Sequence, residues 1–128
     1  MSADDFVRFD SLKLFMHQIY EYRKGVRNLV LCTTTPACAE VLSGRLDRLG
    51  IGYVVQPVDD GKVNLYFGHA LCLDVVRTFC HKPLRNLTAE EDFMLGAMLG
   101  YDIRQQCARY CRRRASYGAG GPCLQAGA

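Results

Sequence analysis

The stretch "IGYVVQPVDDGKVNLYFG", residues 51–68, decides the fold because it has the pattern of two short strands joined by a tight turn. Its first half is rich in β-branched and aliphatic residues, as strands are. Asp60 and Gly61 can supply the left-handed backbone that a two-residue hairpin turn requires. The second half alternates two sets of side chains, Val63, Leu65 and Phe67 against Asn64 and Tyr66. The stretch therefore predicts a β-hairpin.

Upstream of the hairpin, the sequence predicts a helix, a strand and a second helix. Apolar residues recur at helical spacing over residues 12–23, where Asp10 or Ser11 can cap the start and Gly25 can end the helix. "VRNLVLCT", residues 26–33, follows as a strand. The next helix begins with Thr35 as its cap and Pro36 in its first turn, and it ends at Gly50.

These elements predict an α+β domain with the order αβαββα followed by two further helices. The strand before the second helix and the strand after it form a right-handed crossover and run parallel, and the last strand returns antiparallel between them. We therefore expect a two-layer fold with a three-stranded mixed sheet in order 1-3-2. This arrangement resembles half of a ferredoxin-like or ACT-like fold, with extra C-terminal helices.

The C-terminal half of the sequence predicts three helices. Apolar residues over 71–79 mark the first, and Thr88 with Glu91 forms a capping box for the second, which is apolar nearly all round from Phe93 to Leu99 and is expected to be buried. Asp102 with Gln105 can cap the last helix. Its inward face is expected to carry Ile103, Cys107, Tyr110 and Cys111, with the Arg residues facing outward. Residues 1–114 are expected to form one domain, and residues 115–128 a flexible tail.

Composition narrows the class of protein. A chain of 128 residues suits a single core. No stretch of residues is apolar enough for a membrane span and no secretion signal precedes the domain, so we expect a cytoplasmic protein. The seven Cys residues agree with a reducing compartment. The positive charge is concentrated in five Arg residues after position 100.

The segment "CTTTPAC", residues 32–38, is the first candidate site. It joins the end of a strand to the N-terminus of a helix, where unpaired N–H groups favour anions and can lower the pKa of a thiol. Thr33, Thr34 and Thr35 are thus candidate anion ligands. Cys38 is the candidate reactive cysteine, with Cys32 as its resolving partner. The alternative is that the Thr residues are turn and cap residues and that Cys38 packs in the core.

Other patterns point away from metal and nucleic acid. Cys72, Cys80, His81, Cys107 and Cys111 lack the short paired spacings of structural zinc sites, so no metal or other cofactor is expected. A nucleic-acid surface usually adds aromatic residues to its basic face, but Tyr110 is expected on the Cys face of this helix, so the Arg cluster at 104–114 is expected to be a solvated helix end. His17 is expected to pair with Glu21 on the surface. His69 is expected at the opposite end of the sheet from Cys38, too distant for a catalytic pair.

Three segments carry a resemblance to a known family. "YEYRKGVRNLVLCT", "VNLYFG" and above all "EEDFMLGAMLGYDIRQQCARY" closely resemble a small bacterial family of unknown function, domain-of-unknown-function family two-zero-two-three. The resemblance covers roughly residues 12–110 and implies an uncharacterised bacterial α+β protein of this length. It brings no established activity or catalytic residue, and it implies a flavodoxin-like redox protein as a partner.

The sequence favours a non-enzymatic interaction or small-ligand-binding module that forms a homodimer, because it holds a complete fold pattern without a catalytic constellation. A three-stranded sheet leaves an edge that a second copy can cover. Gly96 and Gly100, four residues apart, can let another backbone approach, and with Arg109 and Arg112 they are the candidate interaction residues. The alternative is a thiol-dependent redox or sulfur-transfer protein that uses Cys38.

Overall fold

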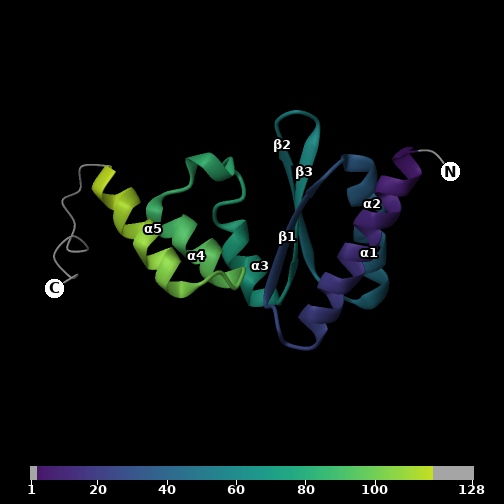
Figure 1. Ribbon diagram of the computed structural model, residues 1–128, viewed down its shortest axis with the longest axis horizontal. Helices are drawn as coiled ribbons and strands as arrows, with labels where there is room; N and C mark the ends of the chain where they lie inside the picture. The colour runs from purple at the N-terminus through teal and green to yellow at the C-terminus, as the bar shows by residue number, and fades with distance from the viewer. Residues whose placement is uncertain (1–2, 117–128) are drawn as a thin grey trace.

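The computed structural model of the protein describes residues 3–116, with side chains from residue 12 onward (Figure 1). The strands are β1 (Leu29–Thr34), β2 (Tyr53–Val58) and β3 (Lys62–Gly68). The helices are α1 (Ala3–Arg23), α2 (Pro36–Leu49), α3 (Ala70–Arg77), α4 (Ala89–Met98) and α5 (Ile103–Ser116), with a short 3-10 helix at Leu84–Asn86. The fold is α+β, as the sequence predicts. Helix α5 continues two residues past Arg114, and the rest of the predicted tail lies outside the described residues.

The strands form one sheet in the predicted order β1-β3-β2. Both ladders are antiparallel, with Leu29 opposite Gly68 in one and Tyr53 opposite Phe67 in the other, so the sheet is antiparallel and not mixed as expected. The two outer strands therefore run parallel to each other on either side of β3. Asp60 and Gly61 form the hairpin turn with φ values of 66° and 67°, which confirms the turn expected from this dipeptide.

Helices cover both faces of the sheet, so the two-layer arrangement expected from the sequence is wrong. In Figure 1, α1 and α2 lie on one side of the sheet and α3, α4 and α5 on the other. Val30, Leu65 and Phe67 of the sheet pack with α1 and α2 in one core, and Leu29 and Tyr66 pack with α3 and α4 in a second core. Helices α3 and α4 close the second face and α5 packs on α4, so the sheet is the middle of three layers.

Because helices cover both faces of the sheet, the alternating residues of β3 are all buried. Asn64 and Tyr66, the more polar of the alternating residues, are 2% and 0% exposed. Both faces of β3 are buried because this central strand has a strand on either side and helices above and below. The alternation therefore sorts residues between two cores.

The ends of the first two helices show one correction and one confirmation. Helix α1 begins at Ala3, so the start predicted at Asp10 or Ser11 is wrong. No Gly or Pro interrupts the chain between Ala3 and Arg23, and the helix runs through both expected caps. Helix α2 starts and ends as predicted, with Thr35 accepting a hydrogen bond from the Cys38 N–H and Gly50 left-handed at φ 70°.

Helices α4 and α5 form a hairpin whose two faces differ from the prediction. The capping box of Thr88 and Glu91 is present. Helix α4 is not buried all round, because Met94 and Ala97 are exposed. On α5 the expected inward face is wrong for Ile103 and Cys107, which are exposed, whereas Tyr110 packs against Phe93 of α4 with ring centroids 5.8 Å apart.

A polar face of α5 packs against α4 instead. Gln106 is buried, and Arg109 and Arg113 both pair with Asp92 of α4, at Nε–Oδ2 2.7 Å and Nη1–Oδ1 3.1 Å respectively. Gly96 of α4 leaves the space that the Gln106 side chain occupies, because a Cβ on Gly96 would lie 2.0 Å from Gln106 Oε1. The two ion pairs and the packing of Gln106 on Gly96 hold this polar face of α5 against α4.

Candidate functional site

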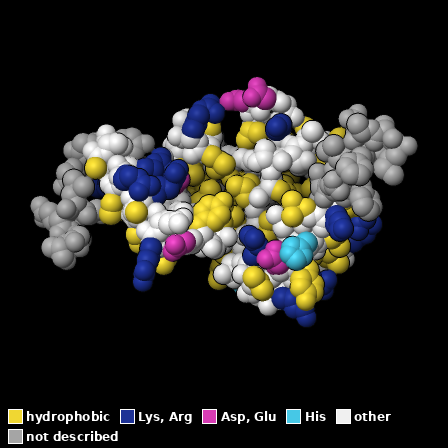
Figure 2. All heavy atoms as spheres, viewed as in Figure 1, with side chains coloured by type: hydrophobic (Ala, Val, Ile, Leu, Met, Phe, Trp, Pro, Cys, Tyr) yellow, Lys and Arg dark blue, Asp and Glu magenta, His cyan; other side chains and the backbone are white. Residues whose placement is uncertain are grey.

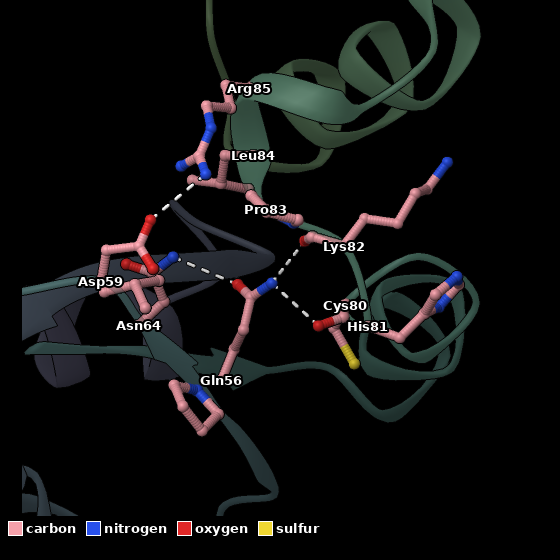
Figure 3. A pocket seen from close by; sticks show the side chains of 11 residues that line it. Gln56, Asp59, Asn64, Cys80, His81, Lys82, Pro83, Leu84 and Arg85 are labelled. Carbon is pink, nitrogen blue, oxygen red and sulfur yellow. Dashed lines mark hydrogen bonds and ion pairs between the residues drawn. The ribbon is translucent and has the colours of Figure 1, made fainter.

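A groove lies between the tip of the β2–β3 hairpin and the segment that follows α3. It measures about 650 Å³. Figure 3 shows Gln56 and Asn64 at its base, Cys80, His81 and Lys82 along one wall, and Arg85 reaching toward Asp59 of the hairpin. The amides of the base and the Arg85–Asp59 pair thus face one concave surface, the usual shape of a small-molecule site, whereas the side chains of His81 and Lys82 point away from Gln56 (Figure 3).

The base of the groove is a ladder of polar side chains that crosses all three strands. Thr33, Asn64 and Gln56 are directly opposite one another in β1, β3 and β2. The Thr33 hydroxyl donates to Asn64 Oδ1 at 2.6 Å, and Asn64 Nδ2 donates to Gln56 Oε1 at 3.1 Å. The Tyr66 hydroxyl donates to the same Gln56 oxygen at 3.1 Å. Burial raises the pKa of Tyr66 to about 12, so this hydroxyl keeps its proton.

Gln56 connects the ladder to the segment after α3. Its Nε2 donates to the carbonyl of Cys80 at 2.8 Å and to the carbonyl of Lys82 at 2.7 Å. With two hydrogen bonds donated and two accepted, the Gln56 amide has no remaining capacity. Its role is therefore to fix the width of the groove. Asn64, which is 2% exposed, donates one N–H to Gln56 and so supports the base of the groove from beneath.

The rim of the groove carries both signs of charge. Arg85 Nη2 and Asp59 Oδ2 are 3.2 Å apart, and both side chains are more than two-thirds exposed. Lys82 pairs with Glu91, and the hydrogen bond from Lys82 lowers the pKa of Glu91. His81 is exposed on the same wall. An exposed ion pair contributes little to stability, so an acidic ligand can displace Asp59 from Arg85 at small cost.

The predicted thiol site at Cys32 and Cys38 lies against the core of α1 and α2. Both side chains are partly buried there. Burial, followed by the charge of Cys38, raises the pKa of Cys32 to about 11, and its thiol donates to the Leu65 carbonyl at 3.7 Å. Cys32 is thus a protonated thiol near neutral pH, a poor nucleophile.

The three Thr residues before α2 do not converge on one point. Thr33 lies in the ladder on the α3 face, whereas Thr34 follows it in the strand and so points to the other face. The Thr35 side chain accepts from the Cys38 N–H at 3.2 Å. The three hydroxyl groups therefore point in different directions and do not form a shared anion site.

The other predicted interaction residues are divided between the α4–α5 contact and the surface. Gly96 and Arg109 face the neighbouring helix within the chain, as described above. Gly100 has φ 82° and lies in the turn between α4 and α5. Arg112 is exposed.

The histidine predictions agree with the geometry. His17 Nε2 lies 3.5 Å from Glu21 Oε1 on the surface of α1. His69 caps α3 at the end of β3, where Gly68 is opposite Leu29, the first residue of β1. Cys38 follows the last residue of β1, so His69 and Cys38 belong to opposite ends of the sheet. Within residues 3–116, no group of three or more His, Cys, Asp or Glu side chains is placed to hold a metal ion, and no helix is long and apolar enough to cross a membrane.

Sequence reasoning did not find Gln56, Asn64, Asp59 or Arg85 as site residues. A signal was present for the two amides, because "VVQPV" and "KVNLY" each put one amide in an otherwise apolar strand. An amide at such a position needs a buried partner if the strand is covered on both faces. The pairing of Asp59 with Arg85 had no comparable signal, since these residues are far apart in sequence.

Comparison with known proteins gives a family and no nearer relative. The search of curated proteins finds no match. The family model described as "Protein of unknown function (DUF2023)" matches residues 13–113. This match spans every strand, most of α1 and nearly all of α5. It confirms the resemblance inferred from the three quoted segments, and the chain belongs to the DUF2023 family of proteins of unknown function.

Proposed function

We propose that this protein is a non-enzymatic module that binds a small, acidic, polar molecule in the groove between the β2–β3 hairpin and the segment after α3. The observation that carries this proposal is the Arg85–Asp59 pair at the rim of an amide-lined groove of about 650 Å³. The ligand's acidic group takes the place of the Asp59 carboxylate on Arg85. Its polar remainder lies against the wall formed by residues 80–82 and the base formed by Gln56 and Asn64.

The base of the groove supports binding rather than chemistry. All hydrogen-bonding positions of Gln56 are used within the protein, and the Tyr66 hydroxyl is buried and donates to Gln56. Groups held in this way keep the shape of a site and do not exchange protons with a substrate. The groove therefore selects a ligand by shape and charge.

A titration followed by two-dimensional NMR tests the proposal, with citrate and inorganic phosphate as probes. We expect saturable shifts at Arg85, at His81 and at the Asn64 side-chain amide. R85Q should weaken binding at least tenfold, and D59N should tighten it because the competing carboxylate is lost. R77Q is the matched control, since Arg77 forms a comparable exposed pair with Asp74 at 2.9 Å outside the groove.

Two results would contradict the proposal. One is the absence of saturable shifts at the groove with either probe. The other is an equal loss of binding in R85Q and R77Q, which would mean that the anion responds only to the net charge of the protein.

The alternative of a redox or sulfur-transfer protein that uses Cys38 gains no support at Cys32, the expected resolving thiol. The raised pKa of Cys32 keeps it protonated near neutral pH. The flavodoxin-like partner implied by the family resemblance stays a prediction, which binding of a purified flavodoxin to the full chain would test.

A further inference from the structure

Strand β1 is an unprotected edge of the sheet. Both outer strands are edges, since the order is β1-β3-β2. Strand β2 contains Pro57, which cannot donate a backbone hydrogen bond, whereas β1 has the sequence LVLCTT, without Pro and without charge. Charged residues and Pro are the usual means by which proteins prevent edge pairing. Among the described residues, β3 is the one strand that pairs with β1.

Apolar surface lies beside this edge on the α4 side. Leu31 of β1 shares a groove of about 440 Å³ with Leu95 of α4, with Leu99 at the end of α4 and with Tyr101, which is 57% exposed. Arg85, Asp92 and Arg109 also line this groove. Figure 2 shows hydrophobic side chains gathered in the hollow between the α4–α5 hairpin and the sheet. The groove runs beside the strand whose outer backbone groups are open.

A second apolar side chain flanks the edge on the α1 side. Leu14 and Met16 lie on opposite flanks of the buried Phe15, because successive helical residues are about 100° apart. Met16 faces α2, since its sulfur accepts a hydrogen bond from Arg45. Leu14, 59% exposed, therefore faces away from α2. Because α1 contacts β1 whereas α2 contacts β2 and β3, the direction away from α2 is toward the outer edge of β1.

We propose that two copies of the chain pair antiparallel through β1 and form a continuous six-stranded sheet in order 2-3-1-1-3-2. A two-fold axis perpendicular to the sheet relates the copies, so residues near the axis meet their own counterparts. A charged residue there would repel itself, and β1 carries none. This rotation keeps each face of the sheet on the same side. The α1–α2 layer of one copy therefore lies beside the α1–α2 layer of the other, and the α3–α4 layers lie beside each other on the opposite face.

The required contact area favours a second copy over a single extended peptide. A stable interface buries about 800 Å² on each partner, and a six-residue strand is only about 20 Å long. The flanking surfaces at Leu14 and at the groove beside Tyr101 extend the contact on both faces of the sheet. A second copy brings both of these surfaces with its own β1, whereas a peptide strand brings neither.

Side-chain parity limits the register. Residues opposite each other in an antiparallel pair point to the same face, and the axis preserves that face. The central pair is therefore a residue with its own counterpart, and the two registers that centre the six-residue strand pair Leu31 with Leu31 or Cys32 with Cys32. In both registers Thr33 lies within two residues of the axis.

Sedimentation and light scattering of the full chain test the proposal. We expect a mass of twice 14.4 kDa. T33K places a charge beside the axis and should weaken dimerisation at least tenfold. T33V removes the hydrogen bond to Asn64 without adding charge, and it should keep the dimer. V55K is the matched control on the β2 edge, where Val55 is 44% exposed, and it should also keep the dimer.

A monomeric mass at all concentrations up to about 200 μM would overturn the proposal, as would equal weakening by T33K and V55K. Far-UV circular dichroism of each variant shows whether it is folded. If T33K is unfolded, protection of the β1 amides from hydrogen exchange decides the matter in the wild type, since protection should rise with protein concentration. Protection independent of concentration would overturn the proposal.

Discussion

At the scale of single residues, the feature with the largest consequence is the saturation of Gln56. One amide satisfies two backbone carbonyls after α3 and two side chains of the sheet, and it is only 4% exposed. A buried polar group that loses its partner retains the full cost of its desolvation. The contribution of Gln56 to stability is therefore larger than that of a surface hydrogen bond.

Replacement of Gln56 by Leu should lower the free energy of unfolding by roughly 3 kcal/mol, because Asn64, Tyr66 and two carbonyls lose a partner at once. Urea denaturation measures the change. Q105L on exposed α5 surface is the control and should change stability by less than about 0.5 kcal/mol. A loss in Q56L no larger than that of Q105L would show that the ladder does not hold the groove.

The buried thiol gives a prediction in pH. With a pKa of about 11, Cys32 is about one part in a thousand thiolate at pH 8, whereas an ordinary thiol with a pKa of about 8.5 is about one quarter thiolate. We expect Cys32 to be alkylated at least about 100-fold more slowly than the exposed Cys107. Mass spectrometry of each cysteine after timed labelling measures both rates. Equal rates would show that Cys32 is accessible and reactive.

At the scale of elements, the α4–α5 hairpin is held by polar contacts on a face that hydrophobic periodicity did not identify. Asp92 pairs with two Arg residues, the Arg113 Nη2 donates to the Leu87 carbonyl at 2.7 Å, and Gln106 covers Gly96. Apolar spacing predicted that the helices exist and where they begin. It failed for the orientation of α5, because the decisive partners belong to another helix.

Replacement of Gly96 by Ala should destabilise the protein by roughly 1–2 kcal/mol, since the new Cβ displaces the buried Gln106 side chain. The double variant G96A/Q106A should recover part of this loss, and denaturation of all three variants measures the coupling. Gly44 in α2 is the matched control. A Cβ at Gly44 would lie 3.7 Å from its nearest neighbour, the Arg48 side chain, so G44A should gain up to about 1 kcal/mol of helix propensity.

A gain in G96A as large as in G44A would contradict the close approach of the two helices. Additive effects of G96A and Q106A would contradict it as well. Either result would mean that α5 can move away from α4 without cost.

The Asp92 cluster predicts a pH dependence. Burial alone would raise the pKa of Asp92, but the hydrogen bond and charge of Arg109, with Arg113, lower it overall. A carboxylate whose pKa is lowered on folding contributes stability above its unfolded pKa of about 3.9, and that contribution is lost as the pH falls through the folded value. The stability difference between wild type and D92N should therefore be largest above about pH 5 and should shrink below pH 4.

Melting temperatures of both proteins between pH 3 and 7 measure this difference. D74N is the control, because Asp74 and Arg77 form an exposed pair that contributes little. A difference between wild type and D92N that stays constant across the range would contradict the role given to the cluster.

At the scale of the whole molecule, one thin sheet serves two cores. Leu46 is buried on the α2 side and Leu73 on the α3 side, and successive residues of β3 alternate between the two cores. Both cores pack on the same three strands, so unfolding of one core exposes the face of the sheet that it covers and destabilises the other core. We expect the protein to unfold in a single cooperative transition.

Replacement of Leu46 or of Leu73 by Ala should lower the unfolding free energy by about 2–5 kcal/mol in either case. Each variant should keep one transition that coincides by circular dichroism and by tyrosine fluorescence. Two separated transitions in L73A would mean that the layer of α3 and α4 unfolds on its own.

The local part of this fold could be predicted from the sequence, and its long-range part could not. The Asp60–Gly61 turn, the Thr35 cap, the Thr88–Glu91 box and the strand order depend on short-range chemistry and on the handedness of crossovers. The third layer and the groove depend on where the last two helices pack. Gln56 and Asp59 meet partners more than 20 residues away, and no local pattern specifies such a meeting.

Strand β3 has no surface of its own, since every residue from Val63 to Gly68 is buried. Sequence drift in this protein is therefore unevenly distributed. Divergence can accumulate on the outer faces of α1, α2 and α5, where a new side chain meets solvent, while any change in β3 must be accommodated by neighbours on both sides of the sheet at once. In the six-residue segment VNLYFG, residues 63–68, nearly every substitution therefore requires a compensating substitution elsewhere. We expect this short segment to be retained in distant relatives.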